Sequence, residues 1–216
     1  EVAVFVRNVI KMALPINCRR SVQQLYGVSL TRLRAPVIAR SGRDIKLEIG
    51  SGPIRGKNGW TTMDLSTQSD LCWDLRNPLP FPDSCITTIY SSHLLEHFCY
   101  PDLMKLLREC WRVLKPNGVC SVCVPDARVY INGYLEPDTF DRNHLTYAPA
   151  IFSDCKMDII NYVAYMNGQH RYMFDEDNLC HILSRVGFGL VRVRDFDPHL
   201  DLPERRHESI YANAVK

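Results

Sequence analysis

The chain has 216 residues, of which 46% are apolar and 23% charged, as expected for a folded globular protein of one domain. The net charge of +2 divides unevenly: residues 1–46 carry nine Lys/Arg and two acids, whereas the remainder carries seventeen and twenty-two. The first apolar run, Val2 to Val6, is too short to cross a bilayer and does not follow a basic region, which argues against a signal peptide.

Residues 1–43 are predicted to form a basic helical N-terminal arm of one or two helices, with breaks at Pro15 and Pro36. Such an arm suits an anionic partner, and a peripheral membrane contact through this segment is one interpretation. The alternative is a solvated helix face packed on the acidic body, with a structural role or a role in a homo-oligomer.

From Ile45 onward, candidate strands alternate with candidate helices, which predicts an α/β domain over residues 44–216 with a parallel sheet. The expected elements are strands at 46–49, 59–63, 86–91, 119–124, 190–196 and 209–215, a helix at 102–114, and a helix that Asp175 or Asp177 caps and that runs to Arg185.

Residues 125–170 interrupt this alternation. They are rich in aromatic residues, histidines and prolines and show no clean periodicity. We therefore expect a substrate-covering insertion at about 126–174, hereafter the covering segment.

Nine cysteines are scattered through apolar runs, where reduced cysteine behaves as a small hydrophobic residue. Cys120 and Cys123 have C-x-x-C spacing but fall in a candidate strand, so their sulfurs are predicted to point to opposite faces of the sheet. This pattern favours a reducing, cytoplasmic setting.

A glycine-rich turn follows the first candidate strand, in the segment Glu48-Ile49-Gly50-Ser51-Gly52. Asp64 lies at the end of the next strand, 14 residues beyond Gly50. A flexible turn followed by a strand-end acid is typical of nucleoside binding. A nicotinamide dinucleotide is disfavoured, because the third glycine of G-x-G-x-x-G is displaced to Gly56 and the acid comes earlier than about 20 residues on.

Further segments follow in an order and spacing that resembles the class I S-adenosylmethionine-dependent methyltransferases, specifically the small stand-alone enzymes that modify metabolites, lipids and sugars. The matching segments are Glu48 to Gly52, Asp64, Asp74-Leu75 with Leu79-Pro80-Phe81-Pro82-Asp83, Ile89 to His97, and Arg112 to Gly118.

The resemblance implies a Rossmann-like fold: a mostly parallel seven-stranded sheet with helices on both faces and an antiparallel last pair. It implies S-adenosyl-L-methionine as cofactor, with Asp64 on the ribose hydroxyls and with Asp74 and the Leu75 amide at the adenine edge. The residues expected to contact the cofactor are Glu48, Gly50, Ser51, Gly52, Asp64, Leu65, Asp74, Leu75 and Ser91. A helix N-terminus behind the glycine turn is expected to offer free N–H groups to the cofactor.

The string His93-Leu94-Leu95-Glu96-His97 has the H-x-x-E-H spacing of a zinc peptidase. That chemistry needs both histidines on one long helix, whereas here the string directly follows a strand, so no metal is predicted. His93 and His170 are instead the candidate general bases. The candidate substrate contacts are His97, Tyr130, His144 and Arg171.

The sequence thus predicts an enzyme that transfers a methyl group by in-line displacement to an oxygen of a small metabolite, sugar or lipid. A nucleic-acid acceptor has only the basic arm in its favour, since the Asn/Asp-Pro-Pro-aromatic string of base-modifying relatives is not seen. A non-catalytic protein that binds the cofactor or a partner is the other alternative.

Overall fold

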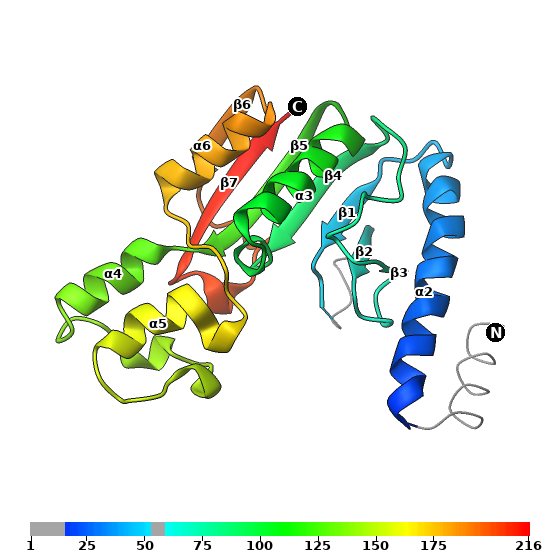
Figure 1. Cartoon of the computed structure of the whole chain (residues 1–216). Helices are drawn as coiled ribbons and strands as arrows, with labels where there is room; N and C mark the ends of the chain where they lie inside the picture. Colours follow the sequence, from blue (N-terminus) through cyan, green and yellow to red (C-terminus); the bar gives the residue numbers. More distant parts are fainter. Residues whose placement is uncertain (1–15, 53–58) are drawn as a thin grey trace.

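The computed structural model describes residues 16–52 and 59–216. Its centre is a seven-stranded sheet in the order β3-β2-β1-β4-β5-β7-β6 (Figure 1). β1 to β5 run parallel, and β7 lies antiparallel between β5 and β6, so the predicted sheet is confirmed. The strands are β1 Lys46–Ile49, β2 Trp60–Asp64, β3 Leu71–Cys72, β4 Ile86–Ser92, β5 Leu114–Pro125, β6 Leu190–Arg194 and β7 Ser209–Val215.

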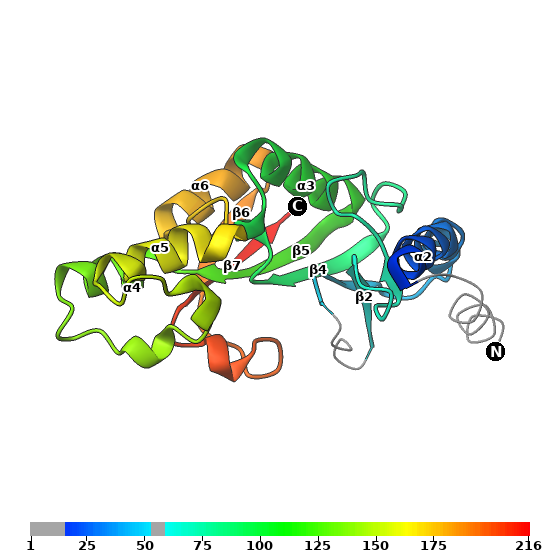
Figure 2. The ribbon, with the colours of Figure 1, turned by 60° about the horizontal axis from the view of Figure 1, so that its bottom comes forward.

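Helices flank this sheet and extend beyond it. In Figure 2, α3 and α6 lie against the same face, and α4 and α5 lie beyond one end of the strands. α2 runs beside the edge strand β3, where Thr31 donates a 3.0 Å hydrogen bond to the Cys72 carbonyl. The α-helices are α2 Ile16–Ala39, α3 Tyr100–Val113, α4 Ala127–Leu135, α5 Met157–Tyr165 and α6 Glu176–Val186. Short 3₁₀ turns are η1 Leu95–His97, η2 Arg142–His144, η3 Ala148–Ala150, η4 Met166–Gly168 and η5 Pro203–Arg205.

The helix predicted over 102–114 is α3, and its apolar residues form the stripe that the periodicity indicated. Leu103, Leu106, Leu107 and Cys110 are buried against the sheet. The helix predicted to reach Arg185 is α6, in which Asp175 is the N-cap and accepts a 2.8 Å hydrogen bond from the Asn178 amide.

A break predicted at Pro36 is wrong, because α2 continues to Ala39. Pro36 sits in the last turn of the helix, where it removes only the hydrogen bond to the Arg32 carbonyl. Its own carbonyl still accepts a 3.2 Å bond from the Arg40 amide. Ala35 beside it is fully buried, so packing on the sheet compensates for the lost bond. Pro15 lies outside the described residues.

Strand alternation decides where the C-x-x-C thiols lie. Cys120 packs in the main core together with Val122 and Val124, whereas Ser121 and Cys123 face the other side of the sheet. The prediction of opposite faces is confirmed. The eight cysteines from Cys72 to Cys180 are free thiols.

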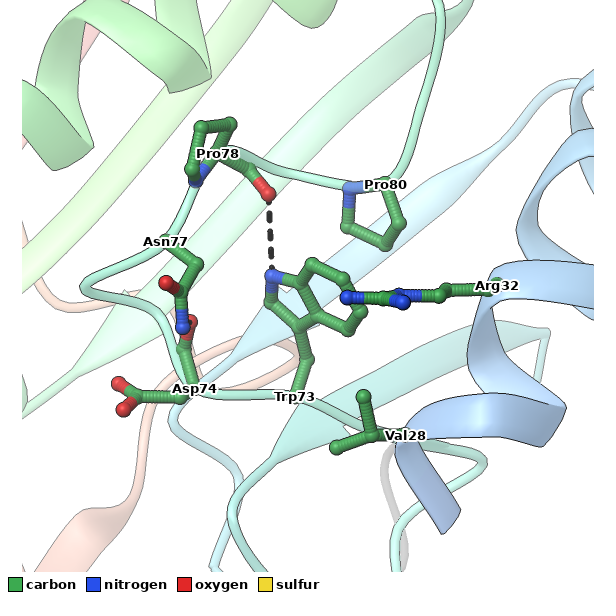
Figure 3. Close-up of a pocket in the computed structure, with 7 residues that line it drawn as sticks. All are labelled: Val28, Arg32, Trp73, Asp74, Asn77, Pro78 and Pro80. Carbon is green, nitrogen blue, oxygen red and sulfur yellow. Dashed lines mark hydrogen bonds between the residues drawn. The ribbon is translucent and has the colours of Figure 1, made fainter. Parts of the chain in front are cut away.

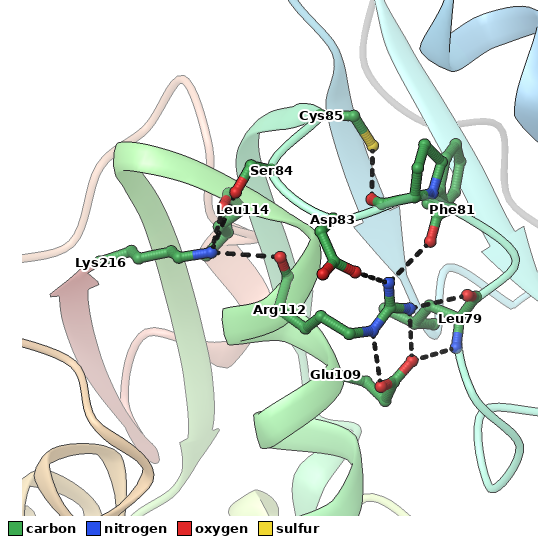
Figure 4. Close-up of polar contacts among 10 residues, drawn as sticks. Leu79, Phe81, Asp83, Ser84, Cys85, Glu109, Arg112, Leu114 and Lys216 are labelled. Atoms are coloured by element: carbon green, nitrogen blue, oxygen red, sulfur yellow. Dashed lines mark hydrogen bonds and ion pairs between the residues drawn. The ribbon is translucent and has the colours of Figure 1, made fainter.

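The Leu79-Pro80-Phe81 string is fixed to α3 by Arg112 (Figure 4). The guanidinium donates to the carbonyls of Leu79 and Phe81 at 3.0 and 2.9 Å, and it forms ion pairs with Glu109 and Asp83 at 2.7 and 2.6 Å. Glu109 in turn accepts a 2.7 Å bond from the Leu79 amide. These contacts give the string a structural role: they hold the β3–β4 connection against the sheet.

The covering segment has a small core of its own, separate from the main core. Its buried residues are Tyr130, Leu145, Ala150, Ile159, Tyr162 and Val163. Tyr130, Tyr162 and Phe140 belong to this core or pack against it, whereas the aromatic side chains of Tyr147, Phe152 and Tyr165 are exposed.

Candidate functional site

A cavity of about 440 Å³ lies where β2 and β4 end. Asp64, the last residue of β2, forms part of its wall, and Leu94 and His97 approach from the segment after β4. Its remaining lining comes from Leu65, Trp73, Asp74, Leu75, Arg76, Phe98, Cys99, Asp102 and Arg171. Carboxyl ends of parallel strands are where open α/β sheets bind their ligands.

The Asp64 carboxylate holds the glycine-rich turn beside this cavity. Its Oδ2 accepts a 3.0 Å hydrogen bond from the Gly52 amide, and its Oδ1 accepts a 2.8 Å bond from the Ser66 amide. Each carboxylate oxygen keeps a second lone pair, so Asp64 can still accept hydrogen bonds from two hydroxyl groups, such as those of a ribose.

Both glycines of the turn adopt positive φ angles, 71° at Gly50 and 64° at Gly52. A Cβ on Gly50 would lie 2.5 Å from Leu94 Cδ1, whereas a Cβ on Gly52 would meet no atom of the described residues within 4 Å. Gly50 is therefore required by close packing, and the positive φ of Gly52 is a backbone conformation that glycine adopts readily. The predicted helix behind the turn falls on residues 53–58, outside the described residues.

Asp74 and Leu75 follow β3 and face the same cavity. Arg76 donates two hydrogen bonds to the Asp74 carboxylate, at 2.9 Å from Nε and 2.7 Å from Nη2. These bonds lower the pKa of Asp74. Leu75 is 7% exposed, so its side chain supplies an apolar wall. An acceptor, an amide and an apolar side chain at this position fit a purine edge and face.

A second cavity, of about 510 Å³, shares Trp73 and Asp74 with the first (Figure 3). The Trp73 indole nitrogen donates a 3.1 Å hydrogen bond to the Pro78 carbonyl. The Arg32 guanidinium of α2 lies 5.8 Å from the centre of the Trp73 ring. Trp73 thus forms the partition between the first cavity and α2.

The other predicted cofactor contacts lie in or next to the turn. Glu48 is in β1, in register with Thr62 and Tyr90. The hydroxyl of Ser51 lies 3.4 Å from the Gly52 carbonyl. Ser91, near the end of β4, is buried and its hydroxyl has no hydrogen-bond partner among the described residues.

His93 follows β4 in a left-handed conformation, with φ of 48°. Its Nε2 lies 2.8 Å from the Ser209 hydroxyl, and its Nδ1 lies 3.9 Å from Glu96 Oε1. Burial, assisted by the positive charge of Arg205, lowers the pKa of His93 to about 2. The imidazole is consequently neutral near pH 7.

Glu96 in η1 is 1% exposed. Burial raises the pKa of its carboxyl to about 8. His97 and His170 stand beside it with their rings 5.1 Å apart, one from η1 and the other from the end of the covering segment. Arg171 follows His170 and reaches the cavity wall.

Two predicted substrate contacts, Tyr130 and His144, are not among the residues that line the cavity. Tyr130 is 1% exposed in the core of the covering segment, and its hydroxyl donates to Glu208. His144 stacks on His207 with ring centres 4.0 Å apart. Both contacts join the covering segment to residues 205–209. Through Ser209, these residues also reach His93 in the segment that directly follows β4, hereafter the β4 exit.

Several residues of the site were not identified from the sequence. Ser209 and Arg205 reach the β4 exit from more than 100 positions away, and Arg205 Nη1 lies 3.0 Å from both the carbonyl and the hydroxyl oxygen of Ser92. No local pattern indicates such contacts. Trp73 could have been identified from the sequence, because it directly precedes Asp74, one of the predicted cofactor contacts.

The chain matches a family of known domains. The model described as "Methyltransferase domain" matches residues 60–122. That span runs from β2 through β4 and α3 into β5 and so includes Asp64, Asp74 and the β4 exit. No curated protein matches the chain.

Among solved structures, the fold is similar to a SAM-dependent methyltransferase from Archaeoglobus fulgidus, with a TM-score of 0.50 and 16% identity over 90% of this chain and 94% of that one. It is also similar to an S-adenosylmethionine-dependent methyltransferase from Mesorhizobium loti, with a TM-score of 0.50 and 17% identity over 87% of this chain and 96% of that one. These similarities concern the fold. None of the helices in the described part of the chain combines the length and apolar character needed to cross a bilayer.

Proposed function

We propose that the chain is a class I S-adenosylmethionine-dependent methyltransferase and that it methylates an oxygen of a small metabolite, sugar or lipid. The methyltransferase-domain match over residues 60–122 and the similar folds support this proposal. The observation that carries the proposal is the cavity at the ends of β2 and β4, with Asp64 and Asp74 on one wall and His97 on another. This arrangement supports a cofactor position next to a proton-accepting group.

S-adenosylmethionine supplies, when bound, a methyl group on a positively charged sulfur. We propose that Asp64 accepts hydrogen bonds from its ribose and that Asp74 and Leu75 hold its adenine. Gly50, Ser51 and Gly52 would carry the amino-acid end, with Glu48, Leu65 and Ser91 around them. The positive φ angles of Gly50 and Gly52 and the remaining lone pairs of Asp64 support this placement.

His93 is the better placed of the two proposed bases. Its imidazole is held by Ser209 close to the β4 exit, so the ring has a fixed orientation. The burial that lowers the pKa of His93 also weakens it as a base, so its candidacy rests on this geometry. His170 donates Nδ1–H to the Val163 carbonyl at 2.8 Å and leaves Nε2 beside Glu96 and His97. That environment makes His170 less suited to take a proton from an acceptor.

The covering segment supports a small acceptor. Its end brings Arg171 to the cavity and His170 beside Glu96 and His97, and the contacts of Tyr130 and His144 with residues 205–209 fix its position over the β4 exit. In this proposal Tyr130 and His144 influence acceptor binding indirectly, because they fix the shape of the covering segment. The free thiols suit the cytoplasmic setting proposed for the chain.

The test is transfer of labelled methyl from S-adenosylmethionine into a fractionated cell extract, read as S-adenosylhomocysteine release. We expect labelling in the small-molecule or lipid fraction, with products that behave as methyl ethers or esters. His93→Gln should lower the rate about 10²–10⁴-fold, the usual contribution of a general base. Asp138→Asn, at an exposed position of the covering segment, is the matched control and should leave the rate unchanged. Labelling confined to RNA, or to nitrogen atoms, would contradict the proposal.

A further inference from the structure

Three side chains of metal-ligand type meet beside the cavity. Glu96, His97 and His170 each offer one ligand atom, and these atoms all lie within 4.8 Å of one another. Two imidazoles and one carboxylate form a common donor set for divalent transition metals.

Both histidines are oriented by backbone carbonyls. His97 Nδ1 lies 3.0 Å from the Gln169 carbonyl, and His170 Nδ1 lies 2.8 Å from the Val163 carbonyl. Because a carbonyl can only accept, each Nδ1 must carry the proton, which leaves the Nε2 lone pair of both rings free. This is how proteins orient histidines that bind metals.

The Glu96 carboxylate is buried without a partner. Among residues 16–52 and 59–216, neither of its oxygens accepts a hydrogen bond from another residue, and no Lys or Arg forms an ion pair with it. The imidazole nitrogens of His93 and His97 lie 3.9 Å from Oε1, too far for a hydrogen bond. A buried carboxyl group in this state carries either a proton or a bound cation.

Backbone hydrogen bonds hold the three residues together without a ligand. The amides of Arg171 and Tyr172 donate to the Glu96 carbonyl at 2.8 and 3.2 Å. These bonds attach the end of the covering segment to η1 and place His170 against Glu96. The donor set is therefore preorganised by the fold.

We propose that Glu96, His97 and His170 bind one divalent transition-metal ion, such as Mn²⁺ or Zn²⁺. Three protein ligands leave coordination positions open. The His97 side chain is 36% exposed and lines the cavity, so the open side of the site would face the cavity. If the proposed oxygen methylation holds, an acceptor oxygen could bind there and lose its proton more readily.

This site differs from the zinc-peptidase pattern considered above. The H-x-x-E-H string contributes its glutamate and its second histidine, but His93 is held by Ser209 instead. The third ligand, His170, comes from the far end of the covering segment. Our proposal therefore departs from the sequence-based expectation that the chain binds no metal.

The experiment is a titration of the metal-free protein with Mn²⁺, in which the electron paramagnetic resonance signal of free Mn²⁺ is followed. Mn²⁺ is chosen because it binds thiolates poorly, so the cysteines do not interfere. We expect one Mn²⁺ per chain. Glu96→Gln and His170→Gln should each weaken binding at least tenfold, whereas His181→Gln, at an exposed position on α6, should not change it.

Absence of saturable Mn²⁺ binding by the folded protein would overturn the inference, as would binding that both ligand variants retain. Circular dichroism checks that the variants fold; should the buried substitutions unfold the chain, His97→Ala at the partly exposed position carries the test. Mn²⁺ binding without methyl transfer to any oxygen would support the metal site and contradict the proposed function, so the two failures are distinguishable.

Discussion

Replacing Asp201 with alanine is expected to lower the free energy of unfolding by about 3–5 kcal/mol, the usual effect of removing one partner from a buried ion pair. Asp201 is 2% exposed and pairs with Arg194 at 2.6 and 2.8 Å. It also accepts a 3.0 Å bond from the Tyr90 hydroxyl and a 2.8 Å bond from the Asp197 amide. The substitution would leave the Arg194 guanidinium largely buried without its counter-charge.

Urea denaturation of the two proteins measures this difference. Asp195→Ala is the control, because Asp195 is exposed and contacts Arg194 only through its backbone carbonyl. A loss below about 1 kcal/mol for Asp201→Ala would show that this network does not stabilise the fold, since that is the range of exposed ion pairs.

The same pair has a defined pH dependence. Burial alone would raise the pKa of Asp201, but the hydrogen bonds from Arg194 outweigh it and the pKa is lowered. The stabilisation is therefore present above the unfolded-state pKa, about 3.9, and is lost as the pH falls through the lower folded-state pKa. The stability difference between wild type and Asp201→Ala should accordingly shrink below about pH 4.

Gly50→Ala is expected to reduce both stability and cofactor affinity. An alanine there would keep a φ of 71°, which costs roughly 1–2 kcal/mol, and its Cβ would overlap Leu94, which costs roughly 1–3 kcal/mol more. Because Leu94 lines the cavity, its displacement should also weaken S-adenosylhomocysteine binding, by about tenfold for each 1.4 kcal/mol of binding free energy lost.

The Gly42→Ala variant separates the cost of a positive φ angle from the cost of steric overlap. Gly42 has a similar φ of 69°, but a Cβ added there would meet no atom of residues 16–52 and 59–216 within 4 Å, and the residue lies outside the cavity. We expect a stability loss of about 1–2 kcal/mol for this variant and an unchanged affinity. Equal affinity losses in the two variants, measured by calorimetric titration, would contradict the role given to Gly50.

The fold was largely predictable, because hydrophobic patterning and turn residues are local signals. The strand at 209–215 and the cap at Asp175 follow directly from them. The break predicted at Pro36 is wrong because tertiary packing on β3 keeps the last turn of α2 helical, and such packing is not visible in the local sequence.

The site was only partly predictable. Gly50, Asp64 and Asp74 are ordered along the chain in a recognisable series, and the structure places Asp64 and Asp74 on one cavity. The meeting of Glu96 with His170 depends on backbone bonds across more than 70 residues, and that of His93 with Ser209 spans 116. Contacts of this kind leave no pattern of residue spacing in the sequence. The sequence therefore indicated the types of residue in the site, but not which of them contact one another.

The central claim is that the cavity at Asp64 holds the methyl donor, and calorimetric titration with S-adenosylhomocysteine tests it most directly. We predict one molecule bound per chain, with affinity falling about 100-fold or more in Asp64→Ala, since two hydrogen bonds to a charged group contribute roughly 3 kcal/mol or more. Asp138→Ala, at an exposed position outside the cavity, should bind as wild type does. No binding by the intact protein, or binding that Asp64→Ala leaves unchanged, would contradict the account.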